Sequence, residues 1–320
     1  MGGMKDPKVA VLLPCYNEQA AITGVIEDFR AALPEARIYV YDNNSTDRTA
    51  EAARQAGAVV RAEARRGKGN VVRRMFADIE ADVYVMADGD GTYDAESAPA
   101  MIRLLIDENL DMVVGTRTET GQGSAYRPGH RFGNRLFTLS VQALFGRRFS
   151  DILSGYRVFS RRFVKSFPCR SQGFEIETEL TIHSLDLRLP VGEVGTPYSS
   201  RPEGSASKLN SVSDGLRILK EILWLLKANR PLMFFGSIAV LLALLSLALA
   251  VPLLVTYSET GLVPRFPTAV LSTGIMILSF LSLACGLILD SVSRGRREVK
   301  ALRYLSLPSI AEVLEPSPRR

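Results

Sequence analysis

Asp88 and Asp90 stand two positions apart, directly after the apolar run at residues 83–87. A hard divalent cation takes oxygen ligands, and Mg²⁺ in proteins is usually held by one or two carboxylates together with substrate phosphates. Gly89 and Gly91 have no side chain, so a ligand can approach the backbone closely at this point. The pair therefore predicts a site for a metal-bound phosphate, and a plain acid–Gly–acid turn is the alternative.

Two further polar segments follow apolar runs in the same way. Residues 14–18 (Pro-Cys-Tyr-Asn-Glu) follow the run at 8–13, and residues 42–47 (Asp-Asn-Asn-Ser-Thr-Asp) follow the run at 37–41. No GxGxxG segment follows the first run, which disfavours a dinucleotide-binding fold, and the chain contains no GxxxxGK[ST] phosphate-binding loop.

The elements that must position these segments alternate between apolar runs and helical patterns. The expected strands are 8–13, 37–41, 58–62, 83–87 and 112–115, and the expected helices are 20–33, 47–56, 68–80 and 96–108. Such alternation predicts an α/β fold in which a mostly parallel sheet carries helices on both faces. Ligands of such sheets bind beyond the carboxyl ends of the strands, so the polar segments are expected to converge on one site.

A basic block follows the acidic first third of the chain. Residues 117–170 contain 11 basic and two acidic side chains, whereas residues 1–116 contain 13 basic and 19 acidic ones. Arg131 and Arg135 are four positions apart on an expected helix and so face the same way. Guanidinium groups suit phosphate oxygens, so these two arginines and Arg117 predict contact with an anionic acceptor.

The composition excludes several classes of protein. A hydrophobic fraction of 47% and a charged fraction of 23% exclude a disordered or collagen-like chain. Three cysteines without a CxxC pair exclude a disulfide scaffold, and with only two histidines they disfavour a zinc site. The net charge of +5 arises in the C-terminal third, because the first 212 residues sum to zero. This distribution argues against a nucleic-acid partner.

Two long segments near the C-terminus contain no charged side chain, namely residues 232–257 and residues 269–289. About 20 apolar residues suffice to cross the hydrocarbon core of a bilayer, and buried core helices are the alternative. Basic residues flank the pair on both sides, so the positive-inside rule predicts a hairpin with both ends in the cytoplasm. These are Lys227, Arg230, Arg294, Arg296, Arg297 and Lys300.

The expected organisation has four parts: a cytosolic α/β domain at 1–212, an amphipathic interface helix at 213–230, a transmembrane hairpin at 231–290 and a cytosolic basic tail at 291–320. The interface helix is predicted because four leucines between 216 and 226 share one helical face, and a helix packed on the α/β domain is the alternative. The expected location is the inner (cytoplasmic) membrane, with the lipid bilayer as a partner.

The polar segments at 14–18, 42–47 and 88–90 together resemble those of the GT-A glycosyltransferases of family 2. Three later segments look like those of polyprenyl-phosphate sugar synthases, which include the dolichol-phosphate mannose and glucose synthases and their bacterial undecaprenyl relatives. They are residues 151–159 (Asp-Ile-Leu-Ser-Gly-Tyr-Arg-Val-Phe), 173–179 (Gly-Phe-Glu-Ile-Glu-Thr-Glu) and 204–209 (Gly-Ser-Ala-Ser-Lys-Leu). The resemblance covers residues 8–230, and the two-span hairpin also looks like that of the bacterial members.

The resemblance implies an enzyme that transfers a sugar, with inversion, from a nucleotide donor to a membrane polyprenyl (undecaprenyl) phosphate, using Mg²⁺ or Mn²⁺. The implied metal ligands are Asp88 and Asp90, which form the implied catalytic set with Arg117 and Arg131. The implied donor-binding residues are Pro14, Tyr16, Glu18, Asp42, Lys68 and Asp88. The implied contacts of the acceptor phosphate are Arg117, Arg131, Arg135 and Lys208.

Two departures from the family pattern bear on the donor. Mannose-type members often have a Gln two positions after the second Asp, whereas this chain has Thr92, and only Asp42 remains of a frequent acid pair because Asn43 follows it. Thr92 favours a UDP-sugar, such as UDP-glucose or UDP-GlcNAc, over GDP-mannose. The product would be a polyprenyl-phosphate monosaccharide for envelope glycans or glycoprotein modification.

Two other functions stay open. One is a glycosyltransferase that acts on another lipid or on a polysaccharide chain, and the other is a non-enzymatic membrane scaffold with a degenerate transferase domain. The sugar, the metal and the oligomeric state, including a homo-oligomer, are open as well.

Several charged side chains outside the main motifs have simpler interpretations. The resemblance places Glu177 and Glu179 near the site, whereas the sequence alone allows a solvated first turn of a helix. His183 is expected to be structural. Arg161 and Arg162 are expected to be solvated or to contact lipid headgroups.

Overall fold

The structure is a computed structural model, which describes residues 5–119, 149–173, 175–199 and 230–315, together with Leu223, Leu226 and Lys227. The chain divides into two compact units, of which the first comprises residues 1–211 with 300–320 and the second residues 212–299. Arg131, Arg135 and Lys208 lie outside the described residues. So does the expected interface helix, apart from the three single residues just named and Arg230.

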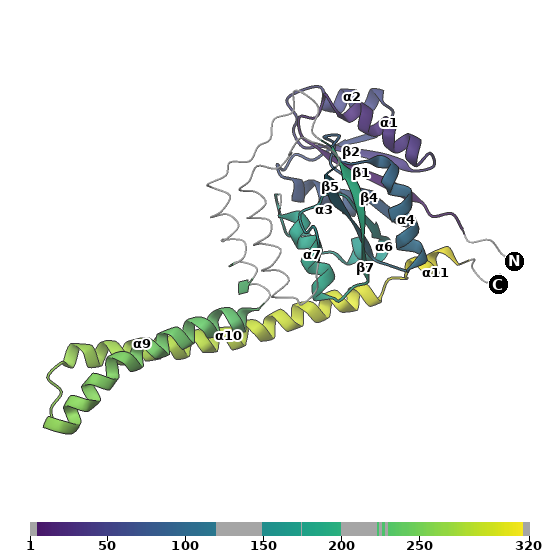
Figure 1. Cartoon of the computed structure of the whole chain (residues 1–320). Helices are drawn as coiled ribbons and strands as arrows, with labels where there is room; N and C mark the ends of the chain where they lie inside the picture. Colours follow the sequence, from purple (N-terminus) through teal and green to yellow (C-terminus); the bar gives the residue numbers. More distant parts are fainter. Residues whose placement is uncertain are drawn as a thin grey trace. The chain divides into compact units, whose positions relative to one another are not determined.

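The first unit is built on one sheet whose described strands follow the order β3-β2-β1-β4-β6-β5-β7 (Figure 1). The strands are β1 (Val9–Cys15), β2 (Arg37–Asp42), β3 (Val59–Ala62), β4 (Val83–Met86), β5 (Met112–Glu119), β6 (Arg157–Ser160) and β7 (Val191–Tyr198). β6 runs antiparallel to both of its neighbours, β4 and β5, and every other pair is parallel. The prediction of a mostly parallel sheet is confirmed.

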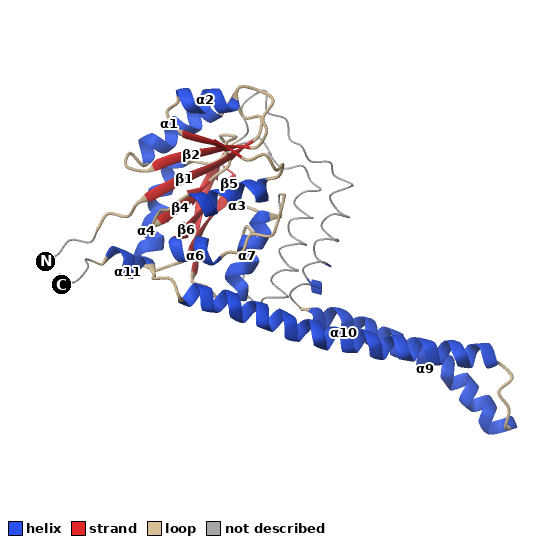
Figure 2. Cartoon of the chain, turned by 180° about the vertical axis from the view of Figure 1, so that it is seen from behind, coloured by secondary structure: helices blue, strands red, loops and turns tan. Residues whose placement is uncertain are grey.

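Helices cover both faces of this sheet, as predicted (Figure 2). One face carries α1 (Ile22–Ala32), α2 (Thr49–Gln55) and α4 (Ala98–Asp107), with the short 3₁₀ helix η1 (Ala95–Ser97) before α4. The other face carries α3 (Lys68–Asp78), α6 (Arg161–Ser166) and α7 (Ile176–Asp186). The elements expected in residues 8–116 are therefore all present, with ends that differ by a few residues.

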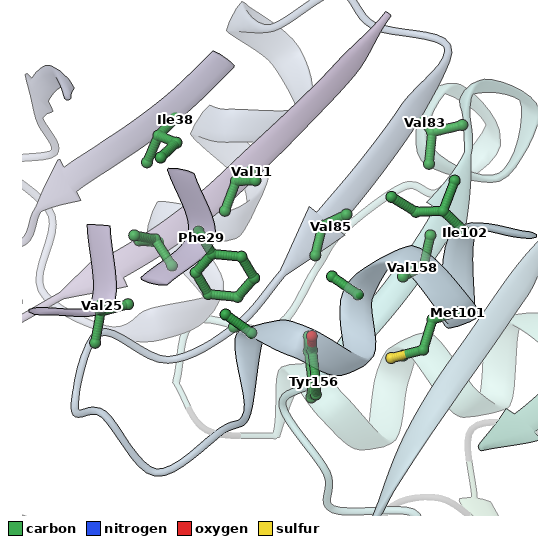
Figure 3. Close-up of a cluster of buried hydrophobic side chains, with 14 of the residues drawn as sticks. Val11, Val25, Phe29, Ile38, Val83, Val85, Met101, Ile102, Tyr156 and Val158 are labelled. Atoms are coloured by element: carbon green, nitrogen blue, oxygen red, sulfur yellow. The ribbon is translucent and has the colours of Figure 1, made fainter. Parts of the chain in front are cut away.

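Alternation along the strands divides the core between the two faces, because successive strand residues point in opposite directions. Val85 and Val158 belong to the cluster that includes Phe29 of α1 and Met101 of α4 (Figure 3). On the opposite face, Phe76 of α3 packs edge-on against Tyr84 and Phe159, with ring centroids 6.4 and 5.7 Å apart. Both faces of the central strands are thus buried, which holds their carboxyl ends in fixed positions.

Residues 300–315, which fall within the expected basic tail, form part of the first unit. They contain α11 (Ile310–Leu314), which begins with a capping box between Ser309 and Glu312. Ile310 and Leu314 are buried in the same core cluster as the side chains of α1 and α4. The backbone N–H of Lys5 also donates to the carbonyl of Leu314 at 3.1 Å. The core of this unit is therefore built from residues far beyond position 212.

A second contact of this C-terminal segment centres on Asp111, which is buried just before β5. The hydroxyl of Tyr304 donates to its Oδ2 at 2.6 Å, and Arg162 donates to both carboxylate oxygens at 3.0 and 3.1 Å. The guanidinium carbon of Arg162 also lies 4.3 Å from the centroid of the Tyr304 ring. The expectation that Arg162 is solvated or on lipid is wrong, since it is paired inside this unit.

The second unit contains α9 (Pro231–Thr260) and most of α10 (Phe266–Leu305). The two helices are joined by side-chain hydrogen bonds, from Ser246 Oγ to the carbonyl of Ser272 and from Ser279 Oγ to the carbonyl of Ala239, both at 2.7 Å. Small residues and interhelical hydroxyl bonds are typical of helix contacts in membranes. The described residues thus form a hairpin of two apolar helices.

The large apolar side chains of this hairpin are mostly exposed. In the most apolar window of each helix only 11% of the residues are buried, and both helices are long and apolar enough to cross a membrane. A core helix of a soluble protein would bury most of such a window. The observation favours the membrane interpretation of residues 232–257 and 269–289 over buried core helices.

Candidate active site

The loops after β1 and β2 are joined by several hydrogen bonds. Asn17 and Asn44 adopt left-handed backbone conformations, with φ of 57° and 63°, which asparagine tolerates better than most residues. The backbone N–H of Thr46 donates to Asn17 Oδ1 at 2.7 Å, and the N–H of Asn17 donates to Ser45 Oγ at 2.9 Å. The two loops therefore form one continuous surface at the carboxyl edge of the sheet.

The thiol of Cys15 lies within electrostatic range of four of the predicted acidic side chains. Burial raises the pKa of this thiol, and the negative charges of Glu18, Asp88, Asp42 and Asp90 raise it further, in that order of size. The structure therefore brings together the acidic residues from three separate loops, as the sequence predicted. Cys15 stays protonated in these surroundings, so it packs against the loops and does not act as a nucleophile.

Asp90 is buried and its carboxylate is oriented by Thr92. The hydroxyl and the backbone N–H of Thr92 donate to Asp90 Oδ1 at 2.7 and 3.2 Å. Gly89 lies against the sulfur of Cys15, where a Cβ atom would collide. A side chain at this position would force Cys15 or the loop to shift, which accounts for the glycine between the two acids.

Asn43 takes the place of the second acid that is frequent in the family. Its side-chain amide donates to the carbonyls of Glu63 and Arg65 at 2.9 and 2.8 Å, while its Oδ1 accepts from the N–H of Gly67 at 2.7 Å. A carboxylate could not donate the first two bonds. Asn43 therefore fixes the loop that leads to Lys68, a role that the sequence analysis missed.

Lys68 at the start of α3 is held between two carboxylates. Its ammonium contacts Asp88 Oδ1 and lies 2.5 Å from Glu177 Oε1. Burial alone would lower the pKa of the ammonium, but Asp88 and Glu177 outweigh burial, so this pKa is raised. Lys68 is therefore charged at every physiological pH and adds a fixed cation beside the first acid of the pair.

The turn that carries Lys68 packs directly on the loop at residues 171–173. The N–H of Gly69 donates to the carbonyl of Gly173 at 3.1 Å, and a Cβ atom at Gly69 would collide with the backbone of this loop. Glu179 holds the same loop from the other side, accepting from the N–H of Ser171 at 2.7 Å. Glu177 thus contacts the site, whereas Glu179 supports the loop beside it.

Residues 151–157 connect two parts of the site. Asp151 pairs with Arg117, and the hydroxyl of Ser154 donates to the carbonyl of Gly115 at 2.6 Å. At Gly155 a Cβ atom would lie 2.9 Å from Asp88 Oδ2 and 3.0 Å from the ammonium of Lys68. The buried Arg157 fixes the segment by donating to the carbonyls of residues 152 and 154.

Arg117 lies near the end of β5 and faces the same edge of the sheet. Its guanidinium carbon is 5.5 Å from the centroid of the Tyr198 ring. Burial and then Asp88 raise the pKa of the neighbouring Tyr93, while Arg117 and Lys68 act on the same phenol in the opposite direction. Tyr93 Oη accepts from the N–H of Gly155 at 2.9 Å. Acidic and basic parts of the predicted site therefore meet around Tyr93.

The donor set suits a metal that is shared with a substrate. Within the described ranges no three His, Cys, Asp or Glu side chains are grouped so as to hold a metal ion. Asp88 and Asp90 supply two carboxylates at one edge, and a hard cation completes its coordination with phosphate oxygens and water. The residues present fit Mg²⁺ or Mn²⁺ bound together with a nucleoside diphosphate.

The predicted site residues are not all placed alike. Glu18, Asp42, Lys68, Asp88 and Asp90 gather at one edge, with Arg117 beside them. Pro14 is buried within β1 and Tyr16 is partly buried just after it, so both lie at this edge, while Arg131, Arg135 and Lys208 lie outside the described residues. The sequence analysis assigned no role to three residues of the site, namely Asn43, Tyr93 and Gly155. It left the role of Glu177 open.

A mixed sheet of this order, with an acid pair at the carboxyl edge beside two joined loops, is the arrangement of the GT-A fold. Residues 10–167 match the family model described as glycosyl transferase family 2, and the chain belongs to this family. It is a glycosyltransferase.

Relatives agree with this assignment, and solved structures share the fold. The chain is 39% identical over 231 residues to the glycosyltransferase AglJ of Haloferax volcanii, covering 72% of this chain and 76% of that protein. It is 29% identical over 214 residues to the dolichyl-phosphate hexose transferase of the same organism, covering 67% of this chain and 92% of that protein. Among solved structures, glucosyl-3-phosphoglycerate synthase from Mycobacterium tuberculosis shares the fold, with a TM-score of 0.55. It was crystallised with Mn²⁺, UDP and glucosyl-3-phosphoglycerate. The two chains are 24% identical, and the match covers 69% of this chain and 79% of that chain.

Proposed function

We propose that this protein transfers a sugar from a nucleotide donor to a polyprenyl phosphate in the membrane, with inversion at the anomeric carbon. The observation that carries the proposal is the meeting of Asp88 and Asp90 with the cations of Lys68 and Arg117, in a chain that also carries an exposed apolar hairpin. The name of a relative, dolichyl-phosphate hexose transferase, supports a lipid phosphate as the acceptor class.

The donor that we propose is a UDP-sugar, such as UDP-glucose or UDP-GlcNAc. Asp42 Oδ1 is buried and makes no hydrogen bond to the described protein atoms, although Oδ2 accepts from the N–H of Ser45 at 3.3 Å. A buried acceptor atom favours a ligand that brings an N–H or O–H group. The structural neighbour named above binds UDP with Mn²⁺, which supports the same base.

Asp88 and Asp90 would hold Mg²⁺ or Mn²⁺ at the diphosphate of this donor. When bound, such a metal neutralises charge on the departing nucleoside diphosphate. Thr92 keeps the carboxylate of Asp90 in a single orientation through two hydrogen bonds. Lys68 adds a fixed positive charge at Asp88, where the donor phosphates would lie.

The acceptor needs no strong base from the protein. A phosphate monoester is largely dianionic near neutral pH because its second pKa is about 6. One of its oxygens attacks the anomeric carbon while the bond to the nucleoside diphosphate breaks, and the electron pair leaves on the diphosphate oxygen. We assign the acceptor phosphate to Arg117, with Arg131, Arg135 and Lys208 as further proposed contacts, since a guanidinium fork matches phosphate oxygens.

The acceptor's hydrocarbon chain stays in lipid, so we propose that the hairpin crosses the inner membrane with the first unit in the cytosol. This orientation follows the positive-inside rule for the flanking basic residues. A cysteine placed at Ser258 should then be labelled by an impermeant reagent from outside, and one placed at Ser293 should not. Labelling of the Ser293 variant instead would overturn the orientation.

The function is tested with the full chain in lipid nanodiscs that contain undecaprenyl phosphate. A panel of radiolabelled nucleotide sugars is added with Mg²⁺ or Mn²⁺, and label that moves into the lipid fraction is measured. We expect transfer from one UDP-sugar and its loss in excess EDTA. Transfer only to soluble acceptors, or no transfer from any donor, would overturn the proposal.

A further inference from the structure

The ammonium of Lys68 is shared by two carboxylates that are far apart in the sequence. Asp88 follows β4, whereas Glu177 lies in the first turn of α7. The side chains of Lys68 and Glu177 are only 9% and 7% exposed, so water screens this pair weakly, while that of Asp88 is 30% exposed. The arrangement gives Lys68 a second, buried anionic partner in addition to Asp88.

The charges of these four groups can be counted directly. Asp88, Asp90 and Glu177 each carry one negative charge, and Lys68 carries one positive charge, which leaves a net charge of two negatives at the site. Without Glu177, Lys68 would cancel Asp88, and a single net negative charge would face a divalent cation. Attraction between charges at such short range changes binding strongly where screening is weak.

We propose that Glu177 is a positioning residue: its fixed charge neutralises Lys68 and thereby keeps the Asp88–Asp90 pair doubly negative toward a divalent cation. Lys68 can then stay beside the diphosphate without weakening the metal site. The inference rests on the proposed function, because that function supplies the metal and the diphosphate. It deepens that function by assigning a role to a residue that touches neither.

The ion pair is not the only contact between the turn of Lys68 and the segment that leads into α7. The N–H of Gly69 donates to the carbonyl of Gly173, and the thiol of Cys169 donates to the carbonyl of Gly69 at 3.5 Å. The same loop is held by Glu179, two positions beyond Glu177. A purely structural role would therefore fall to Glu179, which makes it a matched control for Glu177.

The test measures binding of Mn²⁺ alone to the full chain in detergent, by electron paramagnetic resonance of the free ion. Glu177→Gln should weaken Mn²⁺ binding roughly ten-fold or more, because one charge beside the site is lost. Glu179→Gln should lower the thermal midpoint but change Mn²⁺ affinity by less than about two-fold. The reason is that the Glu179 carboxylate accepts hydrogen bonds from backbone N–H groups and does not pair with Lys68. Thermal unfolding of each variant shows whether it is folded.

A double variant separates charge from structure. Lys68→Met combined with Glu177→Gln restores two net negative charges, so Mn²⁺ affinity should return to within a few-fold of the unaltered chain. Affinity for UDP should fall below that of the unaltered chain, because the Lys68 cation is gone. Equal Mn²⁺ binding by Glu177→Gln and the unaltered chain would overturn the inference. So would equal weakening in Glu179→Gln, a lack of recovery in the double variant, or no Mn²⁺ binding by the unaltered chain.

The outcomes distinguish this inference from the proposed function. If the unaltered chain binds Mn²⁺ and the variants follow the charge count, but no sugar reaches lipid, the inference stands and the proposed acceptor fails. If sugar is transferred to lipid and Glu177→Gln binds Mn²⁺ normally, the proposed function stands and the inference fails.

Discussion

Arg117 donates two hydrogen bonds to the carboxylate of Asp151, at 2.6 and 2.8 Å. The two side chains are 14% and 10% exposed, so the pair is largely removed from water. A bidentate pair of this kind fixes the plane of the guanidinium group. Arg117 is thus held in one orientation beside Tyr198.

This pairing predicts a strong energetic coupling between the two residues. Breaking a buried pair by removing one partner typically costs about 3–5 kcal/mol, because the other charge is left buried alone. Arg117→Ala and Asp151→Asn should each lower the free energy of unfolding on this scale. The double variant should lose clearly less than the sum of the two, as chemical denaturation would measure. If the losses in unfolding free energy are additive, the interaction between Arg117 and Asp151 does not stabilise the fold.

Asp90→Asn should leave the fold intact and reduce sugar transfer roughly 100-fold or more, since it removes a charge from the proposed metal site, which would stabilise the leaving group. Thr92→Val is a milder change at the same place, because it removes only the hydroxyl that orients Asp90. Initial rates of transfer with saturating donor would measure both. Full activity of the Asp90 variant, or of the unaltered chain in excess EDTA, would exclude the metal role.

Gly155→Ala should impair function more than stability. The added Cβ would press on Asp88 Oδ2 and on the Lys68 ammonium, which are ends of side chains and can shift. We expect a loss of thermal midpoint of a few degrees at most and a loss of UDP affinity of about ten-fold, because displacement of this pair disturbs the donor phosphates. Calorimetric titration with UDP and a thermal melting curve would measure the two losses. A large drop in the thermal midpoint with unchanged UDP affinity would contradict the prediction.

His183 predicts a pH dependence of stability. Burial, and then the charge of Lys300, lower the pKa of His183 to about 3. Between about pH 6.5 and pH 3 the unfolded chain binds a proton that the folded chain does not, so this residue destabilises the fold progressively as the pH falls below about 6.5. Its contribution changes by about 1.4 kcal/mol per pH unit within that window.

The variant His183→Phe removes this titration, and its ring suits the edge-on contacts with Phe163 and Phe167, whose centroids lie 5.3 Å away. Denaturation midpoints between pH 5 and pH 7 should fall less steeply for the variant than for the unaltered chain. Parallel slopes for the two proteins would mean that His183 is protonated in the folded state as readily as in the unfolded state.

The C-terminal segment predicts that the first unit cannot be isolated by cutting the chain near residue 213. Leu314→Ala deletes a buried side chain from the cluster that contains Phe29 and should cost about 2–5 kcal/mol. Tyr304→Phe removes the hydroxyl that donates to Asp111 and should cost about 1–3 kcal/mol, because a buried acceptor loses a donor. Unchanged stability in both variants would contradict this.

The regular part of the fold was predictable because apolar strands and helices alternate up to β5. β6 was not predicted because it runs antiparallel to its neighbours and so falls outside the alternation of strands and helices. β7 escaped because Gly192, Gly195 and Pro197 lower its strand propensity. Its place at the edge of the described sheet tolerates the proline, whose missing N–H need not face a neighbouring strand.

The acidic part of the site was predictable because each acid follows a strand, and parallel strands end together. The pairing of Lys68 with Glu177 was not, since 109 positions separate them and α7 shows no clear amphipathic pattern. The role of Asn43 was hidden as well, because its use as both donor and acceptor depends on the path of the loop at residues 63–67.

The burial of Ile310 and Leu314 bears on how the protein is made. The ribosome releases residues in order, so α1 and α4, whose side chains belong to the same core cluster, emerge long before α11. Both long apolar helices are synthesised in the interval. The transferase core therefore keeps an uncovered apolar face throughout the synthesis of the hairpin, and its folding can finish only afterwards. Translation that halts within α9 or α10 would yield a chain with an exposed apolar core. Chaperones and proteases would act on such an incompletely folded chain.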